Sequence, residues 1–175
     1  MVIFYNAKSA IDHMYEHVKH TDDITSVYIG TYGIWVGNGC YQIPSKLLLD
    51  LLNGRNISVD LIVGYTSDRV LDYCSNRLIC GYPHIHKYIS YENHAKYILC
   101  SDGYAMIGSA NLNDSTWGEI VSCDYLTPLD YNSVLEFHQH SLQTAKVMRQ
   151  LVSKDTPDVE PSNTIDVSSI FRLSL

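Results

Sequence analysis

The sequence lacks the cysteine patterns that define small cross-linked or zinc-bound domains. Its 175 residues contain five cysteines, an odd number, and no Cys-x-x-Cys pair. A disulfide framework or a zinc ribbon is therefore not expected. Several cysteines lie within apolar stretches, which predicts small buried side chains in a reducing compartment. The five are Cys40, Cys74, Cys80, Cys100 and Cys123.

Signals for export and for membrane insertion are also missing. The apolar run at residues 2–5 is too short for the core of a signal peptide, and no basic segment precedes it. No hydrophobic run approaches the length that crosses a bilayer. We therefore expect a soluble cytoplasmic protein, and the compact size also suits a phage or plasmid origin.

The sequence also has no excess of positive charge. The formal net charge is -7 and the isoelectric point is about 5.5. Proteins that coat nucleic acid indiscriminately are usually basic, so this class is disfavoured. A local positive cleft is still allowed, because affinity for phosphate depends on where the charges lie rather than on their total.

The residues that are present predict one α/β domain over residues 1–152. Hydrophobic residues make up 46% of the chain, which is enough for a core, and fourteen tyrosines favour strands or a groove. Residues 153–175 contain Pro157 and Pro161 among polar residues, so we expect a loosely ordered tail. Apolar residues at helical spacing predict helices at 7–20, 44–54, from Ser67 or Asp68 to Leu78, and 133–152. Short apolar or alternating runs predict strands at 24–30, 59–63, 84–90, 97–100, 104–107 and 120–126.

One segment combines residue types that suit a phosphate. His94 and Lys96 lie two apart, so in extended chain they point to one face. The lysine supplies a compact positive charge, and the histidine can attack or transfer a proton near neutral pH. The small residues of 108–110 let the backbone approach a ligand, while Ser109 and Asn111 add neutral donors for phosphoryl oxygens.

His94-x-Lys96 followed by Gly108-Ser109-x-Asn111 resembles the signature of the phospholipase D superfamily. Glu119 matches the position of a glutamate that holds the catalytic imidazole in many members of that family. The order of elements resembles the family from about residue 10 to 147, although the specific part is 93–119. The resemblance implies a mixed β-sheet flanked by helices on both faces.

The resemblance also implies a mechanism and a partner. Members with one such motif form a twofold dimer, which brings two motifs to a shared axis. One His94 attacks phosphorus to form a phosphohistidine, and the other protonates the leaving oxygen. Lys96, Gly108, Ser109 and Asn111 are expected to hold the phosphoryl oxygens, and Glu119 to fix the tautomer of the imidazole. Neither a metal nor another cofactor is expected.

The motif departs from the family at one position. Members often carry an aspartate five residues after the lysine, where this chain has Ser101, followed by Asp102. Asp102 could serve through a shifted turn, or the support could be absent.

Several functions remain open from the sequence. The leading prediction is a metal-independent endonuclease acting on DNA or RNA, because small single-motif members of the resembled family are nucleases. A second is a hydrolase of phospholipids or small phosphodiesters, and a third is an inactive member that binds nucleic acid or protein. A distant alternative is a metal-binding module, since His13, His17 and His20 share one helical face.

Overall fold

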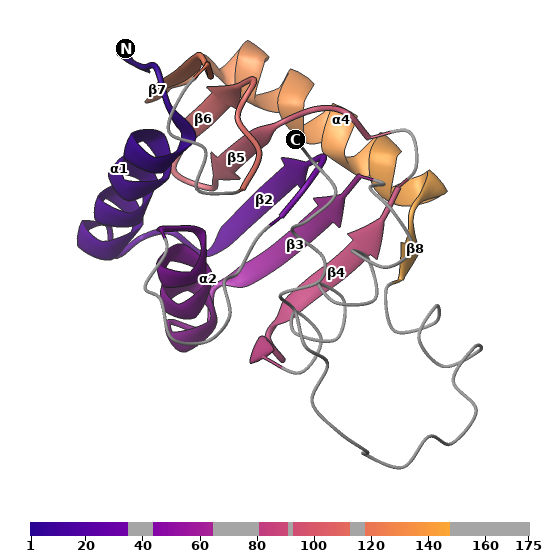
Figure 1. Ribbon diagram of the computed structural model, residues 1–175. Helices are drawn as coiled ribbons and strands as arrows, with labels where there is room; N and C mark the ends of the chain where they lie inside the picture. The colour runs from indigo at the N-terminus through magenta and orange to yellow at the C-terminus, as the bar shows by residue number, and fades with distance from the viewer. Residues whose placement is uncertain (35–43, 65–80, 91–92, 113–117, 148–175) are drawn as a thin grey trace, which may run out of the picture.

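The computed structural model describes residues 1–34, 44–64, 81–90, 93–112 and 118–147 (Figure 1). The helix predicted up to Leu78, the tail at 153–175 and three of the cysteines lie outside these residues; the cysteines are Cys40, Cys74 and Cys80. Cys100 and Cys123 are buried and free, as predicted. Among the described helices, none has the length and apolarity needed to cross a bilayer.

Within the described ranges, eight strands form a single mixed sheet in the order β1-β7-β6-β5-β2-β3-β4-β8. β2, β3 and β4 run parallel to one another, and the remaining pairs are antiparallel. The strands are β1 (Val2–Phe4), β2 (Ser26–Thr31), β3 (Ser58–Val63), β4 (Ile85–Ile89), β5 (Tyr97–Cys100), β6 (Tyr104–Gly108), β7 (Val121–Tyr125) and β8 (Lys146–Val147).

Helices cover both faces of this sheet, as predicted. Figure 1 shows α1 (Ala7–His20) and α2 (Pro44–Gly54) on one face and α4 (Pro128–Thr144) across the other. α1 begins where Asn6 caps it, since the Asn6 side chain accepts a hydrogen bond from the Ser9 amide at 2.7 Å. Pro44 occupies the first turn of α2, where a missing amide hydrogen costs nothing.

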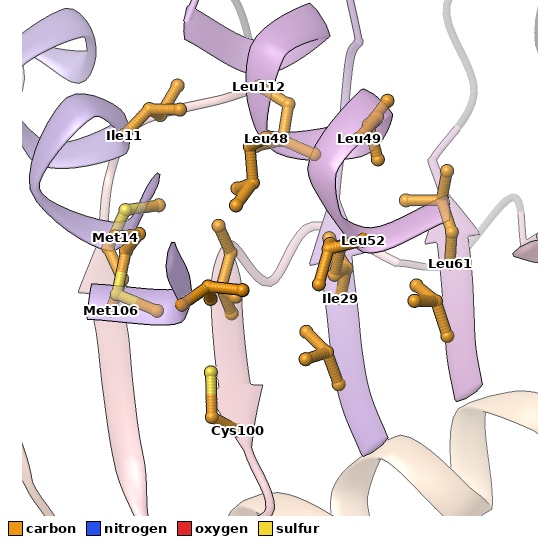
Figure 2. Close-up of a cluster of buried hydrophobic side chains, with 14 of the residues drawn as sticks. Ile11, Met14, Ile29, Leu48, Leu49, Leu52, Leu61, Cys100, Met106 and Leu112 are labelled. Carbon is orange, nitrogen blue, oxygen red and sulfur yellow. The ribbon is translucent and has the colours of Figure 1, made fainter. Parts of the chain in front are cut away.

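The central strands are buried on both sides because each face of the sheet has its own core. Along β5, Ile98 and Cys100 pack with α1 and α2, whereas Tyr97 and Leu99 pack with α4. Side chains alternate between faces in a strand, so consecutive apolar residues serve both cores. Figure 2 shows the larger core, to which α1, α2 and the strands contribute residues such as Met14, Leu48 and Met106.

Two elements differ from the sequence prediction. The last helix spans Pro128–Thr144 instead of 133–152, because Thr127 caps it and residues 146–147 leave it to pair with β4. The Thr127 hydroxyl accepts a hydrogen bond from the Asp130 amide at 3.2 Å, and a proline follows the cap. Residues 2–4, which were not predicted as a strand, pair with β7 as an edge strand.

A histidine of α4 is buried against the sheet, beside Tyr28 and Tyr97. His138 is fully buried, and its Nδ1 shares a hydrogen bond of 2.7 Å with the Tyr97 hydroxyl. Within the described part of the chain its Nε2 has no hydrogen-bond partner. Burial lowers the pKa of His138 to about 4, and the Asp60 carboxylate opposes only part of this shift. The imidazole is therefore neutral at pH 7.

We predict that His138 makes the protein lose stability as the solution becomes acidic. Between pH 6.5 and about pH 4, the His138 imidazole is mostly protonated in the unfolded chain but mostly neutral in the folded chain. The shift in the His138 pKa corresponds to about 3 kcal/mol in the free energy of unfolding. This contribution is fully present above pH 6.5 and is lost as the pH falls towards 4. Denaturant unfolding at a series of pH values should show this slope in the parent and in His140→Gln, which alters an exposed histidine of α4. His138→Gln should flatten the slope, and an unchanged slope in that variant would contradict the assignment.

Candidate active site

The motif residues gather at the carboxyl ends of the parallel strands. β5 runs antiparallel to β2, and Tyr97 at its start pairs with Gly30 near the end of β2. Residues 93–96 form the non-regular segment that leads into β5, so His94 and Lys96 lie just outside the strand. This edge is where ligands usually bind in sheets that contain parallel strands, because loops there surround a crevice.

His94 and Lys96 converge on one aromatic ring. The imidazole of His94 stacks on the ring of Tyr32, with centroids 4.7 Å apart and planes inclined by 15°. The Lys96 ammonium lies 5.8 Å from the centre of the same ring. That ammonium also donates a hydrogen bond of 2.7 Å to the His94 carbonyl oxygen. The two side chains expected to act on phosphorus therefore share one support, and the His94 side chain is exposed to solvent.

Asn111 is tied to the residue that follows this ring. Its Oδ1 accepts a hydrogen bond of 3.0 Å from the Gly33 amide. Thr31 reinforces the link, because its hydroxyl donates to the Gly33 carbonyl at 2.7 Å and accepts from the Leu112 amide at 3.1 Å. With its oxygen engaged, Asn111 keeps the amide nitrogen as its donor group for a phosphoryl oxygen.

Gly108 joins the two halves of the motif. Its amide donates a hydrogen bond of 3.2 Å to the Lys96 carbonyl, which continues the β5–β6 pairing by one step. A side chain is not tolerated here, because a Cβ atom would lie 2.2 Å from the Ile120 carbonyl oxygen. The glycine thus lets the start of β7 pack against the end of β6, directly beside the motif.

Ser109 and Glu119 form a pair of their own. The Ser109 hydroxyl donates to Glu119 Oε2 at 2.5 Å and accepts from the Ile120 amide at 3.0 Å. The serine backbone amide donates to the Ile120 carbonyl at 3.0 Å. In the described residues the Glu119 carboxylate is therefore hydrogen-bonded to Ser109, whereas the ring of Tyr32 contacts the His94 imidazole.

Comparisons with solved structures identify the fold. Nuc from Salmonella typhimurium, a phospholipase D family member, aligns with a TM-score of 0.58 over 83% of this chain and 95% of its own, at 17% identity. The chain has the phospholipase D fold. NucT from Helicobacter pylori aligns with a TM-score of 0.59 over 83% of this chain and 97% of its own, at 13% identity. TrmBL2, an archaeal chromatin protein with a novel mode of DNA binding, aligns with a TM-score of 0.57 over 83% of this chain and 54% of its own, at 9% identity.

Comparison by sequence gives no further assignment. No protein-family model and no curated protein sequence matches the chain. The likeness to Nuc and NucT is one of three-dimensional structure, which supports the fold and leaves the activity to be argued from the site.

The departure at Ser101 lies far from the site within the phospholipase D fold. Ser101 follows β5, at the end of the β5–β6 hairpin opposite Lys96 and Gly108. Its hydroxyl oxygen accepts hydrogen bonds from the Thr25 amide at 2.9 Å and the Ser26 amide at 3.3 Å. This serine fastens the hairpin to the start of β2, which is a structural contribution that needs only an acceptor oxygen.

Asp102 occupies the same turn and binds α1. Its carboxylate lies 2.8 Å from His17 Nε2, and the pair is largely buried. The other Asp102 oxygen accepts a hydrogen bond from the Tyr104 amide at 3.0 Å. Asp102 therefore holds the hairpin turn against α1 and does not reach the motif.

The histidines of α1 have separate hydrogen-bond partners. His13 Nε2 shares a hydrogen bond of 2.7 Å with the Tyr104 hydroxyl, whereas His20 Nε2 lies 3.1 Å from a Glu16 oxygen. Among the described residues, no group of three or more His, Cys, Asp or Glu side chains is placed to hold a metal ion. His13 and His17 both contact Tyr104, whose ring stacks on His17 at 4.0 Å, but the three histidines do not form one ligand set.

Sequence reasoning missed three residues that support the motif. Thr31 and Tyr32 follow the strand predicted at 24–30, and no function was predicted for either residue. Asn93 is buried, and its Oδ1 accepts a hydrogen bond of 3.2 Å from the Ala95 amide, which shapes the segment before β5. Asn93 could have been found from its position next to His94, whereas nothing in the sequence distinguishes Tyr32 from the other thirteen tyrosines.

Proposed function

We propose that this chain is a metal-independent phosphodiesterase that cleaves DNA or RNA through a phosphohistidine at a site shared by two identical chains. The observation that carries the proposal is the convergence of His94 and Lys96 on the ring of Tyr32, with Asn111 bound to the next residue. The phospholipase D fold of the chain, which it has in common with Nuc and NucT, supports the same conclusion.

The reaction follows from the chemistry of these groups. An imidazole nitrogen of His94 attacks phosphorus, so that a P–N bond forms while the P–O bond to the leaving group breaks. The His94 of the second chain gives its proton to the leaving oxygen. That histidine then takes a proton from water, and the resulting attack on phosphorus displaces the first His94. Each step conserves atoms and charge without a further reactant.

The remaining motif residues stabilise charge on the phosphoryl oxygens. When substrate binds, the Lys96 ammonium gives up its hydrogen bond to the His94 carbonyl oxygen and donates to a phosphoryl oxygen instead. This change is favourable because the phosphoryl oxygen carries negative charge. The Asn111 amide nitrogen supplies a neutral donor. Ser109 and Glu119 bind each other where β6 ends and β7 approaches, beside these groups. Lys96 from both chains and a protonated His94 provide the positive charge that a metal ion provides elsewhere.

An exposed apolar strip beside the site supports the homodimer. Ile3 and Ile107 both lie opposite Ser122, so they share the face of the sheet on which Tyr97 packs with α4. α4 covers Tyr97 but leaves this end of the face open, with exposed fractions of 48% for Ile3, 36% for Ile107, 64% for Ile120 and 45% for Phe137. We define these four residues as the apolar strip. A second copy would bury the strip and bring its own motif to the site, because a twofold interface sets the same patch against itself.

The same strip favours one alternative substrate. Ile107 and Ile120 lie next to Gly108 and Ser109, where an apolar substrate could also rest. A phospholipid is therefore the second candidate, and the oligomeric state separates the two: a dimer buries these side chains, whereas a monomer presents them to acyl chains.

We predict cleavage of nucleic acid in the presence of excess chelator, with His94 essential. Single-stranded and duplex DNA, RNA and phosphatidylcholine vesicles would be incubated with the parent, with His94→Ala and with His84→Ala. The His94 variant should lose more than about a thousandfold in rate because the nucleophile is gone. His84→Ala, which alters an exposed histidine outside the site, should cleave like the parent.

Two results would contradict this prediction. One is a His94 variant that folds normally and cuts as fast as the parent. The other is a parent that cleaves none of the nucleic acids, and hydrolysis of vesicles alone would then favour the phospholipid alternative.

We also predict that His94→Ala chains inhibit parent chains by forming mixed dimers with them, because each site needs two His94 residues. After subunit exchange with about a tenfold excess of His94→Ala chains, activity per parent chain should fall to about a tenth, since few parent chains still pair with each other. The double variant His94→Ala/Ile120→Asp, whose apolar strip carries a charge, should not inhibit. Undiminished parent activity in the presence of excess His94→Ala chains would mean that one chain is sufficient.

A further inference from the structure

The catalytic imidazole has a support that the motif does not include. His94 lies on a segment without regular structure, and its side chain is exposed, so that solvent alone would leave its ring free to change rotamer. The face of the ring instead stacks on Tyr32 at 4.7 Å and 15°. Among the described residues, the acidic candidate for this task, Glu119, is bound to the Ser109 hydroxyl.

The position of Tyr32 is itself fixed on both sides along the chain. The residue before it, Thr31, accepts a backbone hydrogen bond from the Gly64 amide at 2.7 Å. The residue after it, Gly33, donates its amide to Asn111 Oδ1 at 3.0 Å. The ring that supports His94 thus stands on the same short segment that anchors Asn111.

Gly64 shows how closely these segments pack. A Cβ atom on Gly64 would lie 2.4 Å from the Asn93 carbonyl oxygen, 2.7 Å from Cδ2 of Tyr32 and 2.9 Å from its Cα. The end of β3 therefore separates Tyr32 from Asn93, the residue before His94, by a gap that only glycine fits. Close packing at Gly64 consequently fixes how near Tyr32 lies to the backbone that leads into His94.

We propose that Tyr32 is the positioning residue for His94 and holds its imidazole in the orientation required for attack on phosphorus. This inference rests on the proposed function, because it gives Tyr32 a part in the same reaction. Fixing a nucleophile in line with its target contributes to the rate of the chemical step rather than to binding. The ring face also lies 5.8 Å from the Lys96 ammonium, so the same side chain attracts the phosphate-binding cation.

The ring, and not the hydroxyl, carries this role. Tyr32→Phe keeps the stacking surface, whereas Tyr32→Met offers an unbranched apolar side chain without a ring. Tyr15→Met is a matched control, because Tyr15 is also half-buried and lies 5.6 Å from a lysine ammonium, that of Lys19 on α1, away from the site.

Proton spectra of imidazole-labelled protein test the contact without any substrate. Stacking on an aromatic ring shifts the His94 ring protons upfield, and this shift should appear in the parent and in Tyr32→Phe. It should disappear in Tyr32→Met and persist in Tyr15→Met. A parent without the upfield shift would overturn the inference, and this readout remains decisive if a variant fails to fold or if the chain cleaves no phosphodiester.

Kinetics on the nucleic acid substrate then measure the positioning effect. We expect kcat to fall between about tenfold and a hundredfold in Tyr32→Met, with KM changed by less than about threefold, because orientation is lost while Lys96 still binds. Tyr32→Phe should restore kcat to near the parent value. Equal kcat in Tyr32→Met and the parent, or loss in KM alone, would overturn the inference while leaving the proposed function intact.

Discussion

The site depends on the register of the β5–β6 hairpin. The Gly108 amide donates to the Lys96 carbonyl at 3.2 Å, which places the two halves of the motif side by side although twelve positions separate these residues in the sequence. A slip by one residue would turn every side chain of the pair to the opposite face. The register is held at the other end of the hairpin, where Ser101 binds the start of β2 and Asp102 binds His17. Residues distant from the chemistry thereby determine where Lys96 and Gly108 meet.

The two cores make that register rigid. Tyr97 and Leu99 pack under α4 while Ile98 and Cys100 pack under α1 and α2, so β5 is fixed from both faces immediately after Lys96. The neighbouring ends of β2 and β3 bring Tyr32 and Gly64 to the same edge, and close packing there leaves room for no side chain on Gly64. The motif is thus supported by ordinary sheet packing, whereas His94 itself is exposed and Lys96 and Asn111 are half-buried.

Much of this could be predicted from the sequence, because the signals were local. Helical spacing gave α1 with its observed bounds, and short apolar runs gave β5 and β6, the two strands beside which Lys96 and Gly108 meet. The end of the last helix was missed because a strand pair with β4 ended it, and no local residue announces such a pairing. The contact between Tyr32 and His94 was missed for the same reason, because it joins positions that only the folded sheet brings together. Glu119 was assigned from resemblance, and its bond to Ser109 depends on the close approach of β6 and β7 that Gly108 permits.

The account rests on His94 as the nucleophile, and trapping the covalent intermediate tests this most directly. The parent would be mixed with a phosphodiester substrate, quenched in base within a single turnover, and analysed by mass spectrometry for a phosphoryl group on each peptide, still esterified to the part of the substrate that has not left. The account predicts an acid-labile phosphoryl group on the imidazole of His94. Product formation with no phosphorylated His94, or with the phosphoryl group on another residue such as Ser109, would contradict it.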